Sequence, residues 1–467
     1  MEKQLLSGAY LIPMDPARSV HKGWGVVIAD DRIEETGPVE KLREKHPDAR
    51  EEHFEDCLLL PGFIDCGGFA GMQLFKGAAQ TSARRREVIE RYWRTADDAP
   101  REEEGELCGA ARLQCGVTTG AVNFPGAGEM DQHAYFRGIS RYLAGYSRTG
   151  AQPVAGVGLA QAEAAPALGQ FLALLRGMDL SVRVYLERLI VSNKVFSRAT
   201  DANFSGLTED DLRTFAAARE LSQRYLCGVT ANAFGNDVAI LMQAGETLRG
   251  MGALLQLCTD MNYAEVRRIA EDGAAVAHMP RETIRYCPFS EFLEAGATCA
   301  VMSDAPFTGG SFDMLQAVRR AQMIEQLRFD DFYCLPAGRQ LELITIDAAR
   351  ALGLERKIGS LEAGKRADLV LVRMDLPRTV PYEDMPLHRL MIDANARQIT
   401  RVYVAGACAV LDGRPLYGAY ASLPERTQEA ALRARAASGI ESLTPPDVYG
   451  SPYCGYAYGK STAEEAR

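Results

Sequence analysis

The sequence lacks the features of a membrane protein and of a nucleic-acid-binding protein. No run of apolar residues reaches the roughly 18 that cross a bilayer, and the amino terminus, MEKQLLSGAYLIPMD, has no apolar core of signal-peptide length. No cluster of Lys and Arg could follow a phosphate backbone, and 52 basic against 62 acidic residues leave a net charge of -10. We therefore expect a cytoplasmic protein that has neither nucleic acid nor a membrane among its partners.

The sequence has no closely spaced cysteine pairs and few histidines. The 11 Cys stand singly, with no C-x-x-C pair, and the 467 residues include six His. Reduced and mostly buried thiols are the default interpretation of such cysteines, so the pattern does not favour a disulfide framework. With 47% apolar and 24% charged residues, the composition is that of an ordinary globular protein.

The two ends of the chain carry matching β-patterns. Residues 1–58 contain apolar and β-branched runs that are broken by turn residues. These strand-like runs are too few to bury a core of their own. Similar alternating runs return at 366–374 and 399–416. We predict that 1–58 and 359–424 form one composite β-sandwich, and that 425–467 forms an Ala/Arg-rich helix followed by an aromatic tail.

The middle of the chain, 59–358, alternates short apolar runs with helical patterns. Two helix starts are clearly signalled: Thr208 has Asp211 three residues on, and Asn262 has Glu265 at the same spacing, which completes a capping box. Eight apolar runs are strand candidates: LLLPGFIDC, GVTTGAVNF, QPVAGVGLA, LSVRVYLERLI, LCGVTANAF, ALLQLCTD, AAVAHMP and ATCAVMSDAPF. Strands that alternate with helices in this way predict an α/β fold, a (β/α)8 TIM-like barrel.

Three segments resemble one protein family. LLLPGFIDCGG (58–68) resembles the first-strand signature of the amidohydrolase superfamily, and GAAVAHMPRE with AVMSDAPFTGG resembles its seventh and eighth strands. ITIDAARALGLERKIGSLEAGKRADLVLV (344–372) resembles the segment that leaves the barrel and re-enters the β-sandwich. The chain is most similar to the branch of cytosine deaminase, guanine deaminase and triazine chlorohydrolase. The resemblance implies hydrolysis of a C–N or C–halogen bond at the barrel's carboxyl-end mouth, a small nitrogen-containing substrate and a homodimer.

The metal ligands that the resemblance implies are missing. In this group, imidazoles from several strands hold a divalent ion that activates water. The first-strand histidines fall on Gly67 and Phe69, and the fifth-strand histidine falls on Ala231. The sixth-strand histidine falls on Leu257, and the glutamate base falls on Phe234. Three or four imidazoles cannot be assembled from the two histidines of the predicted barrel, so we expect no metal and no cofactor.

Asp304, in MSDAPF, is the eighth-strand aspartate that survives. We expect it to act as a general base or substrate anchor; the alternative is a remnant that accepts hydrogen bonds from the next loop. Asp260, at the end of the sixth strand, could pair with it, and Asp65 should point with Gly67 into the barrel, where a buried acceptor role is favoured. These three aspartates form the predicted catalytic set. A rebuilt site in which they and a Cys hold Mg²⁺ is the other interpretation.

The predicted substrate-binding residues belong to the same mouth. Gly67 followed by Phe69 removes imidazole volume and adds an aromatic wall, which suits a planar ligand, whereas an ordinary core role for Phe69 is the simpler interpretation. His278 and Arg281 follow the seventh strand, and a structural role is favoured for the histidine. The complete set is Gly67, Phe69, Glu187, Asn232, His278 and Arg281.

Two functions follow from these residues. The first is a divergent amidohydrolase that acts on a non-peptide C–N bond of a small nitrogenous molecule without the family's zinc. The second is a catalytically inactive pseudoenzyme that binds a ligand or an active paralogue. Fold alone does not choose between them.

Overall fold

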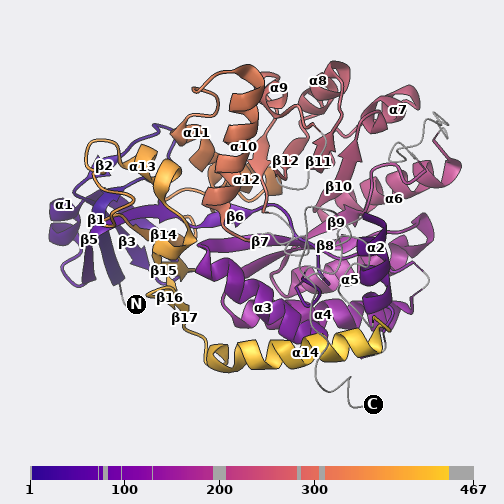
Figure 1. Ribbon diagram of the computed structural model, residues 1–467, viewed down its shortest axis with the longest axis horizontal. Helices are drawn as coiled ribbons and strands as arrows, with labels where there is room; N and C mark the ends of the chain where they lie inside the picture. The colour runs from indigo at the N-terminus through magenta and orange to yellow at the C-terminus, as the bar shows by residue number, and fades with distance from the viewer. Residues whose placement is uncertain are drawn as a thin grey trace, which may run out of the picture.

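The computed structural model describes most of the chain. The described ranges are 3–71, 73–76, 82–95, 97–128, 130–192, 207–280, 286–303 and 311–440. Within them, a β-sheet domain lies beside a barrel of parallel strands and surrounding helices (Figure 1). The prediction of an α/β fold with a TIM-like barrel and a sheet built from both chain ends is confirmed.

The sheet domain joins the two chain ends through one strand. Its strands are β1 (Lys3–Leu11), β2 (His21–Lys22), β3 (Trp24–Ala29), β4 (Arg32–Pro38), β5 (Arg50–Pro61), β14 (Leu369–Arg373), β15 (Ile399–Val404), β16 (Ala407–Leu411) and β17 (Arg414–Pro415). They form a sheet in the order β17-β16-β15-β14-β5-β1-β3-β4, with β2 beside β1. Strand β5 pairs with β1 in parallel and with β14 antiparallel, where Leu59 lies opposite Leu371. Helix α1 (Val39–Lys45) packs on this sheet, whereas α13 (Pro386–Asp393), which lies between β14 and β15 in the chain, packs against the barrel helices α10 and α11.

The barrel strands are parallel and follow chain order. They are β6 (Phe63–Asp65), β7 (Val117–Asn123), β8 (Gln152–Gly158), β9 (Ser181–Leu186), β10 (Gly228–Phe234), β11 (Leu254–Thr259), β12 (Ala275–His278) and β13 (Cys299–Val301). The helices of this part are α2 (Ser82–Trp93), α3 (Pro100–Gln114), α4 (Gln132–Arg148), α5 (Ala165–Gly177), α6 (Glu209–Tyr225), α7 (Asp237–Gln243), α8 (Tyr263–Glu271), α9 (Phe289–Glu294), α10 (Met314–Phe329), α11 (Ala337–Glu342) and α12 (Ile346–Leu352).

The ring of strands is nearly closed between β13 and β6, which lie at the two ends of the sheet order. The carbonyls of residues 343–344 accept hydrogen bonds from the backbone of Val301 on β13 (3.2 Å) and of Ile64 on β6 (2.8 Å). Ser303, just after β13, donates its N–H (2.9 Å) and its Oγ–H (2.5 Å) to the carboxylate of Asp65. A connecting segment and one carboxylate therefore complete the ring in place of a strand ladder.

Side chains alternate between the barrel lumen and the helix layer, as strand geometry requires. The buried cluster in the lumen takes its strand members from Ile64, Cys66, Ala121, Val154, Leu254, Ala275, Ala277, Ala300 and Met302. Neighbouring positions such as Val276 and Val301 belong instead to the larger cluster that contains helix residues. Helix α12 adds Ala348 and Leu352 to the lumen cluster, so this helix covers one end of the barrel.

Both predicted helix starts are confirmed. Thr208 and Asp211 form a capping box at the start of α6, and Asn262 and Glu265 form another at the start of α8. Helix α14 (Leu423–Ala437), yellow in Figure 1, runs along α3, where Arg426 Nη1 donates to Glu106 (3.1 Å). Over the described ranges, none of the helices is long and apolar enough to cross a membrane.

Candidate functional site

Three side chains meet at the carboxyl ends of the barrel strands, the mouth at which barrel enzymes keep their sites. Asn232, on β10, donates from Nδ2 to Tyr185 Oη (3.0 Å) and to Glu187 O (2.8 Å). The Tyr185 ring packs edge-on against Phe69, with 6.0 Å between the ring centroids. Ala231 packs in the cluster shared with the helices. Asn232, and not Ala231 as expected, therefore turns its side chain to the lumen.

Two amides bridge the lumen below this group. Asn123 Nδ2, at the end of β7, donates to Gln256 Oε1 on β11 (2.9 Å). Gln256 Nε2 donates in turn to Cys66 O (2.9 Å). Strands β7 and β11 are four places apart in the eight-stranded order, so they stand on opposite walls of the barrel. The buried pair thus spans the space in which ligands from several strands would have to converge.

Methionine fills the place of the first expected ligand. A Cβ added to Gly67 would lie 2.7 Å from Met302 Sδ, and closer still to Met302 Cε. Such distances are not found between real atoms, and Met302 is 1% exposed, so its side chain cannot move aside into solvent. The position therefore has no room for an imidazole unless Met302 is repacked.

These residues do not fit a zinc ion held as the resemblance implies. The first-strand positions hold Gly67 and Phe69, and the fifth strand presents the Asn232 amide to the lumen. The sixth strand presents the Gln256 amide, and Leu257 packs against the lumen cluster that contains Met302. None of these side chains is an ordinary zinc ligand. Burial raises the pKa of the Cys66 thiol, which keeps it protonated at neutral pH. In the part of the chain that the structure describes, no group of three or more His, Cys, Asp or Glu could hold a metal.

Asp65 lies behind the strand, not in the lumen as expected. Strand β6 ends at Asp65, and Ile64 and Cys66 on either side of it turn into the lumen cluster. The Asp65 carboxylate accepts hydrogen bonds from Ser303, from Gly67 N (3.1 Å) and from Arg112 Nη2 on α3 (3.0 Å). Asp65 and Arg112 are each 0% exposed. This carboxylate is a buried acceptor that ties β6, β13 and α3 together.

The other predicted acids are at the rim or outside the described residues. Asp260 follows β11 and is exposed, with its N–H donating to Tyr286 O (2.7 Å). Glu187 follows β9 and is also exposed. Asp304 and Arg281 lie outside the described residues, so their predicted roles remain predictions.

His278 turns away from the lumen. It is paired in register with Val301, whose side chain lies in the helix-side cluster, and its ring lies 5.1 Å from that of Phe289 in α9. Burial lowers the pKa of His278 to about 4, so the ring is neutral at pH 7. Its Nδ1 has no hydrogen-bond partner within the described ranges. The favoured structural role fits this placement better than contact with a substrate.

Several residues that shape the lumen were not singled out from the sequence. Gln256 and Asn123 are polar residues within or at the end of apolar runs, and a buried polar residue in such a run is a signal that could have found them. Tyr185 lies two positions before the predicted Glu187, at the carboxyl end of β9. Arg112 lies in an ordinary helical pattern, which carries no such signal.

Comparison with known proteins supports the resemblance. Residues 209–408 match the model of the amidohydrolase family, and residues 25–49 match that of the imidazolonepropionase-like composite domain of bacteria. The chain is 26% identical over 429 residues to a 5-methylthioadenosine/S-adenosylhomocysteine deaminase of Desulforudis audaxviator, which covers 88% of this chain and 94% of the deaminase.

Two solved structures share the fold. The adenosine deaminase from Xanthomonas campestris, with bound zinc, is 21% identical with a TM-score of 0.76, and the match covers 93% of this chain and 98% of that one. The atrazine chlorohydrolase of Arthrobacter aurescens TC1, complexed with zinc, is 19% identical with a TM-score of 0.72, covering 91% and 99%. The predicted fold and the predicted resemblance are confirmed.

Proposed function

We propose that this chain, which carries an amidohydrolase family domain over residues 209–408, is a deaminase-like protein that binds a small nitrogen-containing molecule at its barrel mouth and acts on a non-peptide C–N bond. Its alignment with a 5-methylthioadenosine/S-adenosylhomocysteine deaminase covers 88% of the chain, which supports a substrate of the same chemical kind. A homodimer and a cytoplasmic location remain predictions.

The observation that carries the proposal is the buried amide of Asn232. The carbonyl of Glu187 can only accept, so the Asn232 atom that faces it must be the Nδ2 donor. Asn232 Oδ1 is then the acceptor, and it has no hydrogen-bond partner among the described residues. A buried unpaired acceptor is costly, and an amino or ring N–H group of a ligand would satisfy it. A nitrogen-containing molecule supplies such a group.

The neighbouring rings suit a flat ligand. Phe69 is half-buried and Tyr185 is held by Asn232, so the edge-to-face pair has one ring available at the mouth. Aromatic faces stack on planar heterocycles, while the amide selects the pattern of donors on their edge. This combination favours a nucleobase-like ring over an aliphatic amine.

Hydrolysis in this site would rely on carboxylates. Because the residues at the ligand positions do not fit an imidazole-held ion, a carboxylate must take the proton from the attacking water. Asp260 and Glu187 lie at the rim, and we assign the general-base role to Asp304, with Asp260 as its partner. Without a Lewis acid this reaction would be slow compared with that of zinc deaminases.

A second candidate function is ligand binding without turnover. The Asn123–Gln256 bridge and the packing of Met302 on Gly67 fill the level of the lumen from which a metal would act. This packing favours a protein whose mouth still binds a ligand, while the lumen beneath the mouth no longer catalyses a reaction. The two functions share the mouth and differ in whether a C–N bond is broken.

The test measures binding and ammonia release separately. Adenosine, 5-methylthioadenosine and S-adenosylhomocysteine are titrated by calorimetry into the chelator-dialysed protein, and ammonia is then assayed with the same nucleosides. Asn232→Leu should weaken binding about tenfold or more, because the polar contact is lost. Gln152→Leu is the matched control, since its amide lies at the first residue of β8 and donates to Gly150 O (3.4 Å).

The outcomes separate the candidates. Binding with ammonia release that survives chelation, and that Asp260→Asn reduces, supports the proposed reaction. Binding without ammonia release replaces it with the second candidate. Ammonia release that appears only when zinc is added overturns the carboxylate mechanism. Equal binding by Asn232→Leu and the parent protein overturns the assignment of the recognition site.

A further inference from the structure

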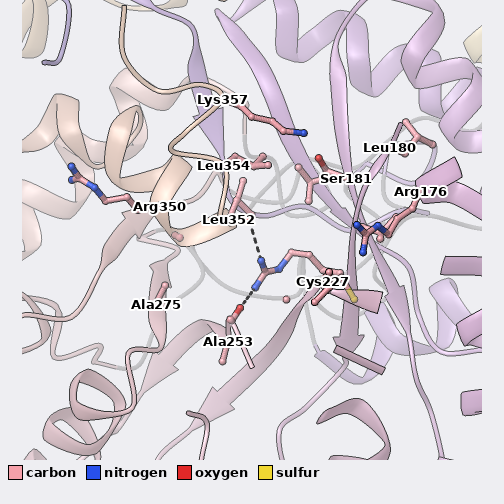
Figure 2. Close-up of a pocket in the computed structure, with 18 of the residues that line it drawn as sticks. Arg176, Leu180, Ser181, Cys227, Ala253, Ala275, Arg350, Leu352, Leu354 and Lys357 are labelled. Carbon is pink, nitrogen blue, oxygen red and sulfur yellow. Dashed lines mark hydrogen bonds between the residues drawn. The ribbon is translucent and has the colours of Figure 1, made fainter. Parts of the chain in front are cut away.

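A cavity of about 410 Å³ lies at the amino end of the barrel, on the side away from the mouth. Sites for small molecules have volumes of roughly 300–1000 Å³. The cavity is lined by residues at the starts of the strands, among them Ser181, Gly228 and Ala275, and by Leu352 at the end of α12 (Figure 2). Because it opens at the opposite ends of the strands, it is separate from the site proposed above.

The guanidinium of Arg183 lies at the base of this cavity and is 4% exposed. Its Nε donates to Thr230 Oγ1 (2.7 Å), and Nη1 donates to Leu352 O (3.3 Å). Its Nη2 donates to Val229 O (3.0 Å) and to Gly252 O (2.6 Å). All four acceptors are uncharged. Burial lowers the pKa of Arg183 to about 10, so the group is still a cation at neutral pH.

The sequence leaves room for this buried cation. A Cβ on Gly228, at the start of β10, would lie 2.5 Å from Arg183 Cζ. Only glycine at this position therefore lets the guanidinium lie flat against the strand. The Arg183 cation is therefore buried with uncharged hydrogen-bond partners only. An anion that binds beside it would gain a strong electrostatic attraction, because the protein supplies no opposite charge there.

Two further cations stand at the rim of the cavity. Figure 2 shows the Arg176 guanidinium and the Lys357 ammonium directed toward it. Arg350 also lines the cavity, but it turns away and pairs with Asp347 (2.6 Å). Asp179 is the one acid among the lining residues that the structure describes. In a chain whose net charge is -10, the lining of this cavity therefore carries more basic than acidic side chains.

We infer that this cavity binds a small molecule that carries a phosphate group. A phosphate offers several acceptor oxygens, and its negative charge would balance the positive charges of Arg183, Arg176 and Lys357. The planar guanidinium of Arg176 can bind two phosphate oxygens at once, and the Lys357 ammonium adds a point charge on a flexible stem. Arg183 already donates four of its five N–H groups to the protein, so it contributes its charge and its one remaining Nη1 hydrogen. The cavity volume leaves space for an organic group beyond the phosphate.

A purely structural role for Arg183 would explain only part of the arrangement. Arg183 does tie β9, β10 and α12 together through its hydrogen bonds. It would do so without Arg176 and Lys357, neither of which forms an ion pair within the described ranges. Those two residues therefore provide the test, because they can be changed without disturbing the buried network.

The experiment titrates inorganic phosphate, and then phenyl phosphate, into the full-length protein by calorimetry at constant ionic strength set with NaCl. The thermal midpoint is followed in parallel, since a ligand that binds the folded state raises it. The double variant Arg176→Gln/Lys357→Gln should bind at least tenfold more weakly, because both cations directed toward the phosphate are removed. Arg350→Gln, which removes a cation that faces away, should bind like the parent protein.

Three results would overturn the inference. They are the absence of a phosphate-dependent effect beyond that of chloride, equal affinity in the double variant and the parent, and an equal loss in Arg350→Gln. The last would indicate a diffuse effect of net charge. Phosphate binding should be unchanged in Asn232→Leu, so this site and the mouth can fail independently.

Discussion

Replacing Asp65 by Asn removes one half of a fully buried ion pair, and its cost can be worked out from the contacts. Asp65 Oδ2 and Arg112 Nη2 are 3.0 Å apart, and both side chains are 0% exposed. The variant keeps the size of the side chain but leaves Arg112 with only neutral acceptors, Gly67 O (2.6 Å) and Ala121 O (2.8 Å) among them. An uncompensated buried charge costs about 3–5 kcal/mol. We expect a loss of that size in the free energy of unfolding.

A double-mutant cycle tests the reasoning. Arg112→Met leaves the opposite charge unpaired and should cost a similar amount, whereas Asp65→Asn/Arg112→Met removes both charges. The double variant should therefore be more stable than the sum of the single effects predicts, by about 1–3 kcal/mol. Urea unfolding followed by the fluorescence of Trp93, in the same part of the fold, is the assay, with Trp24→Phe as background.

Two outcomes would refute this account. A cost below about 1 kcal/mol for Asp65→Asn would show that the buried pair does not hold the ring closed as argued. Additive single effects would show that the two side chains do not depend on each other. An Asp65→Asn protein of unchanged stability that had lost activity would return Asp65 to the catalytic set.

The remaining predictions concern packing and pH. Gly67→Ala should destabilise the protein by about 1–3 kcal/mol through overpacking against Met302, and adding Met302→Ala should relieve part of that cost in the same unfolding assay. Because the pKa of His278 is lowered to about 4 from 6.5, the unfolded state binds the proton first, and stability should fall by roughly 3 kcal/mol between pH 6.5 and 4. His278→Met should remove that slope, as urea midpoints at pH 7 and pH 5 would show, and an unchanged slope would count against a buried neutral ring. Burial raises the pKa of Glu104 to about 7 from 4.5, so stability should fall as the pH rises through that interval, by up to roughly 3 kcal/mol. Glu104→Gln should reduce this loss of stability with rising pH. Thermal midpoints that decline equally in both proteins from pH 5 to pH 8 would contradict the prediction.

Local signals in the sequence were sufficient for many of the elements. The capping boxes at Thr208 and Asn262 depend on residues three positions apart, and the structure places α6 and α8 where they indicate. The matching β-patterns also correctly predicted that the two chain ends join, since β5 and β14 pair residue by residue. Such features are short-range or repeat along a strand, so spacing alone can reveal them.

The orientation of the site residues needed the tertiary structure. Counting alternate positions from Asp65 placed it in the lumen with Gly67, but the strand ends at Asp65 and the alternation ends with it. On β10 the choice between Ala231 and Asn232 depends on which positions of the strand face the lumen, which an isolated run of apolar residues does not specify. A shift of one residue exchanges the two faces of a strand, so small errors invert the prediction.

The sequence by itself determined the barrel, the sheet that joins the chain ends, and the loss of histidine from the positions where the family resemblance expects it. Only the tertiary structure decided what took that space: the Asn123–Gln256 bridge across 133 positions of sequence, and Met302 packed on Gly67. The same holds for the buried Arg183 at the far end of the barrel. Residue types and their spacing report on neighbours along the chain, whereas contacts across a barrel depend on how all eight strands close around one interior.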